Sequence, residues 1–99
     1  MTVHLLKMTP DVYVAAGLGL KPWEFRKNDR DFQVGDILHL ACWDGESFTD
    51  DPPIVRLVVY VLRGGRFGIP DGFCIMTTRR PRRSPFDGNS PSRRFIRRS

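Results

Sequence analysis

The residues with the clearest chemical potential lie close together in the first third of this 99-residue chain. Lys21, Glu24 and Arg26 are followed at once by Lys27 and Arg30. Ammonium and guanidinium groups donate hydrogen bonds to phosphates and base edges, and arginine donates them in pairs because its donors form a planar fork. A carboxylate can accept from an exocyclic amine or take a proton as a general base. These residue types at this spacing therefore indicate a site for a phosphate-bearing or nucleotide-like ligand.

The sequence leaves a structural interpretation open for each of these side chains. Lys21 could be a solvated surface lysine, and Glu24 could simply pair with Arg26 on the same strand face. Arg26 could pair with Asp31 instead. A structural role is the favoured interpretation of Asp29 and Asp31, because Asn and Asp side chains in such turns bond to nearby backbone.

The element that must position these residues is a strand predicted at 22–27. On the period-2 pattern of a strand, Trp23 and Phe25 share one face, and Glu24 and Arg26 share the other. We expect the aromatic face to be core and the charged face to line a cleft. Trp23 has one alternative, which is stacking on a nucleic-acid base.

The hydrophobic pattern predicts further elements around this strand. The predicted elements are a strand at 3–7, a helix at about 10–18, and strands at 22–27, 37–43, 54–62 and 73–78. Thr9 as N-cap, Pro10 at the first helical position and Asp11 in the first turn signal the helix start. The run 37–43 is apolar on both faces apart from His39, which is typical of a central strand. Trp43, at the end of that run, could be a rim residue that stacks on a ligand or a lid on the core.

The charged segment also resembles a known family. Positions 19, 21, 24 and 26 spell G-x-K-x-x-E-x-R, and residues 26–36 continue as RKNDRDFQVGD. This pattern resembles a small phage and bacterial family of domains of unknown function within the ASCH group of PUA-like barrels, and the similarity covers about residues 3–78. The resemblance implies an α+β, mainly β fold: a five- to six-stranded mixed β-barrel with one N-terminal helix, linked to RNA.

Three kinds of function are compatible with these features. The first is recognition of RNA or a nucleotide in a cleft lined by residues 21–30. The second is an ASCH-type hydrolase or ribonuclease acting on RNA or a modified nucleoside, with Lys21 and Glu24 as its catalytic residues. The segment resembles that of ASCH-type amidohydrolases, which use a lysine that Lys21 matches, a threonine at the position of Glu24 and a glutamate from a later strand. This chain departs from that pattern, because no glutamate follows Glu46. The third is a phage-type anti-defence factor that binds a host protein.

The basic charge is concentrated at the C-terminal end. The whole chain carries +5, residues 79–99 carry +7, and residues 1–78 therefore carry −2. This tail is rich in proline and serine and has few large apolar residues, so we expect it to be disordered when free. Its arginines, among them Arg79, Arg80, Arg82 and Arg83, are expected to add phosphate contacts that do not depend on sequence.

Other features exclude several protein classes. The chain has no long apolar run and no signal-peptide pattern at its start, which favours a soluble, cytoplasmic protein without membrane association. Cys42 and Cys74 fall within predicted strands; we expect them to be reduced and buried, with a disulfide between them as the alternative. His4 and His39 have no cysteine or carboxylate at ligand spacing, so we expect neither a metal site nor a cofactor.

Overall fold

The computed structural model describes residues 1–82 and contains five strands and one helix in this part of the chain. The elements are β1 (Val3–Met8), α1 (Pro10–Gly17), β2 (Trp23–Lys27), β3 (Ile37–Cys42), β4 (Ile54–Arg63) and β5 (Phe73–Arg79). The order and type of the predicted elements are confirmed, and so is the α+β, mainly β class. The last strand includes Arg79, one residue beyond its predicted end.

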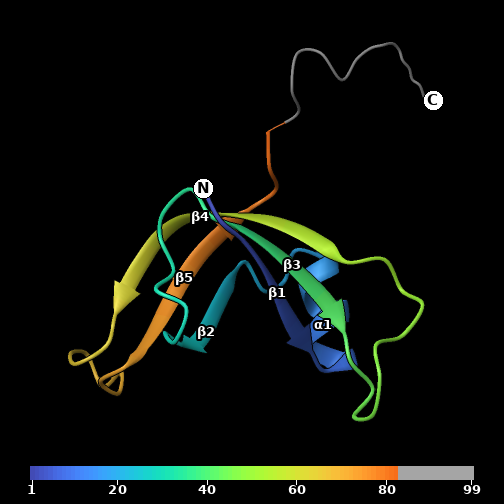
Figure 1. Ribbon diagram of the computed structural model, residues 1–99, viewed down its shortest axis with the longest axis horizontal. Coiled ribbons are helices and arrows are strands. Elements are labelled where there is room, and N and C mark those ends of the chain that lie inside the picture. Colours follow the sequence, from blue (N-terminus) through green and yellow to red (C-terminus); the bar gives the residue numbers. More distant parts are fainter. Residues whose placement is uncertain (83–99) are drawn as a thin grey trace.

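All five strands form one curled sheet in the order β1-β3-β4-β5-β2. The β1–β3 pair is parallel and the other pairs are antiparallel, as the expected mixed arrangement requires. In Figure 1 the sheet bends into an arch, with α1 beside β1 and β3. Within residues 1–82 no strand pairing joins β1 to β2, so the sheet is a half-barrel with an open seam between its two edge strands.

The concave face of the sheet holds the core. The buried cluster consists of Leu6, Met8, Ala16, Phe32, Leu38, Leu40, Val58, Cys74 and Met76. The helix adds Ala16 directly, while Val12 and Tyr13 pack against the edge of the cluster. Strand β3 lies between β1 and β4, which is the interior position that its apolar run predicted.

The ends of α1 set the direction in which the chain enters β2. Thr9 is the N-cap residue and Pro10 begins the helix, as predicted, although the Thr9 hydroxyl donates to Asp11 Oδ1 at 2.6 Å rather than capping the helix backbone. After the helix, Gly19 has a φ of +78°, a left-handed conformation that glycine adopts without strain. This turn places Lys21 just ahead of β2.

The expected burial of β2 is reversed. Trp23 and Phe25 are 47% and 46% exposed, whereas Glu24 is only 2% exposed. The prediction that the two aromatic residues belong to the core was wrong, because the concave face of the sheet takes the even-numbered side chains of β2. Apolarity alone would bury the aromatic face, but pairing with two cations allows Glu24 to be buried instead.

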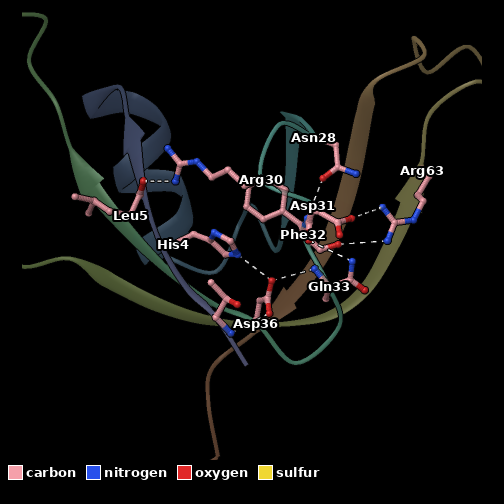
Figure 2. A network of polar contacts seen from close by, with 10 residues as sticks. His4, Leu5, Asn28, Arg30, Asp31, Phe32, Gln33, Asp36 and Arg63 are labelled. Atoms are coloured by element: carbon pink, nitrogen blue, oxygen red, sulfur yellow. Dashed lines mark hydrogen bonds and ion pairs between the residues drawn. The ribbon is translucent and has the colours of Figure 1, made fainter.

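The turn between β2 and β3 is held by side-chain hydrogen bonds to backbone, as predicted from its composition (Figure 2). Asn28 Oδ1 accepts from the backbone N–H of Phe32 at 2.9 Å. Asp31 takes a left-handed φ of +51° and lies 3.7 Å from the Arg63 guanidinium. The turn thereby holds the Phe32 ring in the core, where it is 1% exposed.

A buried carboxylate ties this turn to β1. Asp36 accepts hydrogen bonds from His4 Nε2 at 2.9 Å and from the backbone N–H groups of Gln33 and Thr2 at 3.0 and 3.1 Å (Figure 2). Burial alone would raise the pKa of Asp36, but these three hydrogen bonds together outweigh burial and lower it below its usual value. The His4 ring also meets Phe32 edge-on at 4.7 Å.

Both cysteines are free and buried, as expected. Burial raises the pKa of the Cys74 thiol, and the Arg63 guanidinium lowers it by less, so this thiol is a poor nucleophile. In the part of the chain that the structure describes, no helix combines the length and the apolar character needed to cross a membrane.

Gly64, at the end of β4, has no room for a side chain. A Cβ atom there would overlap the carbonyl oxygen of Pro70 and come within 2.8 Å of that of Phe73. We expect Gly64→Ala to lower the free energy of unfolding by about 1–3 kcal/mol because the loop backbone must shift. The control is Gly17→Ala, whose Cβ would lie an ordinary 3.4 Å from Ile54. Equal urea midpoints for the two variants would contradict this expectation.

Candidate nucleic-acid interface

Lys21, Glu24 and Arg26 converge in the structure, as their spacing suggested. Lys21 Nζ donates to Glu24 Oε2 at 2.5 Å and to the carbonyl oxygen of Trp23 at 2.8 Å. Arg26 Nε donates to Glu24 Oε1 at 3.1 Å. The convergence has a local cause: Glu24 and Arg26 share one face of β2, and Lys21 lies just before that strand begins.

The three side chains form an ion-pair network that leaves an excess of one positive charge. Both Glu24 oxygens accept from a cation, and the side chain of Glu24 is 3% exposed. A carboxylate so enclosed is poorly placed to meet a substrate as a base. Glu24 instead holds Lys21 and Arg26 in place. It therefore pairs with Arg26, as one interpretation of the sequence had it, and it also lies in the cleft, as the other had it.

Two arginines cross the open seam from the β2 side to the edge of β1. Arg26 Nη2 donates to the carbonyl oxygen of Lys7 at 2.9 Å and contacts Met8 Sδ at 3.1 Å. Arg30 Nη1 donates to the carbonyl oxygen of Leu5 at 2.8 Å (Figure 2). These donors occupy edge groups that would otherwise be free to pair with another strand.

The register of β1 explains why these carbonyl groups are available. The carbonyl oxygens of Thr2 and Met8 accept from the β3 side, from the N–H groups of Ile37 and Trp43, both at 2.8 Å. In a parallel pair the alternate residues point their backbone groups the other way. The odd-numbered residues of β1 therefore present their carbonyl groups to the seam.

The seam is hollowed into a groove made of three adjoining depressions, of about 160, 320 and 430 Å³. Arg26 lines all three, and Arg30 lines the smallest and the largest. Thr9 and Val12 at the start of α1 line the middle depression opposite Lys21. We call these depressions together the seam groove. Its middle depression lies between the helix and the 21–30 segment, where the cleft was expected, whereas no helix residue lines the other two.

The seam groove contains the five residues of the 21–30 segment that the sequence proposed as ligand contacts. Its lining includes Lys21, Glu24, Arg26, Lys27 and Arg30. Among the other lining residues, Lys7 and Phe48 were not predicted from the sequence as part of a site. Neither has a motif around it, and only the position of β1 at the sheet edge brings Lys7 to the groove.

The Trp43 side chain contacts two residues that line the seam groove. The Lys7 ammonium lies over the Trp43 ring, 3.8 Å from its centroid, and the Phe48 ring meets it edge-on at 5.0 Å. Trp43 therefore positions Lys7 and Phe48 at one end of the seam groove, through a cation–π contact and an aromatic contact. Phe48 remains 44% exposed there.

The tail arginines lie apart from the groove lining. Arg79 is part of β5 and pairs in register with Leu57, while Arg80 and Arg82 are exposed. None of these three lines the seam groove. Arg83 and the rest of the proposed tail fall outside residues 1–82.

Comparison with known proteins identifies the family of the chain. A family model described as "Domain of unknown function (DUF3850)" matches residues 3–78. No curated protein is similar enough to the chain to count as a match. The matched range includes the helix, the whole seam groove and all five strands except Arg79, the last residue of β5. The chain therefore belongs to the DUF3850 family.

Proposed function

We propose that this protein binds RNA or a nucleotide through the seam groove, in keeping with its resemblance to the ASCH and PUA-like barrels. The observation that carries the proposal is the donor capacity of the two arginines at the seam. Among contacts within residues 1–82, Arg26 uses Nε and Nη2, and Arg30 uses only Nη1. The remaining N–H groups of both guanidinium forks are available to a ligand in the groove, and paired donors of this kind suit phosphate oxygens.

The charge of the groove supports an anionic ligand. Five cationic side chains line it: Lys7, Lys21, Arg26, Lys27 and Arg30. Two carboxylates, Glu24 and Asp29, accompany them. Residues 1–78 as a whole carry a net charge of −2, whereas cationic side chains outnumber carboxylates in the groove. Positive charge is therefore concentrated in the groove. Such local concentration attracts a polyanion.

The burial and the hydrogen bonds of Glu24 support ligand binding rather than hydrolysis. A general base has to reach the proton that it removes, within hydrogen-bond distance. Glu24 is 2% exposed and both of its oxygens already accept from Lys21 and Arg26. We therefore assign Glu24 the role of anchoring the two cations, and we place the ligand against the cations themselves.

Arg30 is the best residue with which to test this function. It is exposed and makes one hydrogen bond across the seam, so its removal should disturb folding little. Arg30→Ala is expected to weaken binding of a fluorescein-labelled 12-nucleotide single-stranded RNA about 5- to 150-fold, as measured by anisotropy.

Arg66→Ala is the matched control, because it removes an exposed arginine that does not line the groove. It should leave the affinity close to that of the wild type. Equal affinities of the Arg30→Ala and wild-type proteins for this RNA would contradict the proposed function.

A further inference from the structure

The convex face of the sheet carries a cluster of exposed aromatic side chains on β2, β4 and β5. Trp23, Phe25 and Tyr60 are 47%, 46% and 54% exposed. Phe73 is half-buried and stacks on Phe25 with ring centroids 5.4 Å apart. We call these four residues the outer aromatic face.

Strand register brings the cluster together. Trp23 pairs with Thr77, which in turn pairs with Tyr60, so one row crosses three strands. The next row on the same side runs from Phe25 through Ile75 to Leu62. Side chains two residues apart on a strand share a face and lie about 7 Å apart. The rings thus form a continuous surface rather than scattered exposed residues.

An aromatic surface of this kind requires an explanation. Single exposed apolar residues are ordinary, whereas contiguous apolar patches mark interaction sites. Residues 1–82 place no other element over this face, since α1 and the 28–36 turn both lie on the concave side of the sheet.

The two charged side chains at the outward positions of β2 and β5 are both positive. Lys27 follows Phe25 by two residues on the same face of β2, and Arg79 follows Thr77 in the same way on β5. Lys21 Nζ lies 4.6 Å from the centroid of the Trp23 ring. On the outward positions of β2, β5 and residues 60–62 there is no carboxylate.

The exposed rings and the positive charges together indicate which kind of partner the outer aromatic face binds. A second copy of the chain would bring one cationic rim against another with no carboxylate to pair them. A single-stranded nucleic acid supplies both flat bases for the rings and phosphates for the cations.

We propose that the outer aromatic face is a second binding surface, which takes single-stranded nucleic acid. Bases stack on Trp23, Phe25 and Tyr60, and phosphates pair with Lys27 and Arg79. The surface adjoins the seam groove along β2, because Trp23 and Phe25 also line the middle depression of the groove and Lys27 lines the smallest. Tyr60 belongs only to the outer face and is therefore the residue that separates the two proposals.

The test uses the fluorescence of Trp23 in the full chain carrying Trp43→Phe, which leaves Trp23 as the sole tryptophan. The probes are a 12-nucleotide oligouridylate and an inorganic polyphosphate of similar length. We expect the oligouridylate to quench Trp23 and the polyphosphate to leave its emission unchanged, because only the former has bases.

Tyr60→Ala should weaken oligouridylate binding about 5- to 150-fold, the range for loss of one base-stacking side chain. Phe67→Ala is the matched control, because Phe67 is 80% exposed on the loop between β4 and β5 and should be neutral. Unchanged affinity in Tyr60→Ala would overturn the proposal, and if Arg30→Ala still weakened binding, the seam groove alone would stand. The reverse result would leave only the outer face.

Two further outcomes would also overturn the proposal. One is quenching of Trp23 by poly-glutamate as strongly as by oligouridylate, which would indicate an acidic protein partner. The other is concentration-dependent dimerisation in sedimentation that protects Trp23 without any oligonucleotide, which would indicate a second copy of the chain.

Discussion

Replacing Glu24 by alanine is expected to lower the free energy of unfolding by about 3–5 kcal/mol, because the change leaves two partly buried cations without their shared carboxylate. The side chains of Lys21 and Arg26 are only 15% and 26% exposed, so water cannot fully replace Glu24. Urea unfolding at neutral pH measures the loss. The control is Glu46→Ala, which removes an exposed carboxylate and should change stability by less than about 0.5 kcal/mol.

Glu24→Gln refines this prediction. Glutamine keeps the volume and one acceptor oxygen but loses the charge. The free energy of unfolding of Glu24→Gln should therefore lie between those of the wild type and Glu24→Ala. Equal stability of Glu24→Ala and the wild type would contradict the anchoring role. The same network implies that Lys21→Ala and Arg26→Ala also reduce stability, because each strips a buried carboxylate of a partner.

Replacing Asp36 by alanine is expected to lower the free energy of unfolding by about 2–4 kcal/mol, because three donors lose their acceptor. Those donors are His4 Nε2 and the backbone N–H groups of Thr2 and Gln33. Asp36 is 3% exposed, so little water can reach the groups left behind.

The Asp36 contribution should also depend on pH. Because the pKa of Asp36 is lowered in the folded protein, its stabilisation is complete above the usual value of 3.8 and is lost as the pH falls through the folded pKa. The stability difference between the wild type and Asp36→Ala should therefore shrink below about pH 4. The control is Asp50→Ala, at an exposed site, whose stability difference from the wild type should not shrink in this way as the pH falls. A constant difference from pH 7 to pH 3 would contradict this account.

Local signals in the sequence were sufficient for the elements and for the position of the groove. The five strands follow from runs of alternating or continuous apolar residues, and the helix start follows from Thr9 and Pro10. The G-x-K-x-x-E-x-R spacing also predicted the convergence of Lys21, Glu24 and Arg26, because neighbours on one strand have a fixed geometry.

Features that depend on distant pairing could not be predicted. Glu24 is buried and Trp23 is exposed because α1 and the turn that carries Phe32 pack on the side of the sheet to which Glu24 points. No local sequence pattern indicates on which side of the sheet these segments pack. The His4–Asp36 contact joins residues 32 positions apart. The open seam arises because β1 pairs only with β3 in the described sheet.

The most direct test of the seam groove is an amide chemical-shift titration of the ¹⁵N-labelled full chain with a uridine trinucleotide. We expect the largest shifts on the facing edges of the groove, at Leu5, Lys7 and Arg30, and we expect these shifts to be lost in Arg30→Ala. Titration shifts confined to other surfaces, with these three amides unmoved, would contradict the claim that the groove holds the ligand.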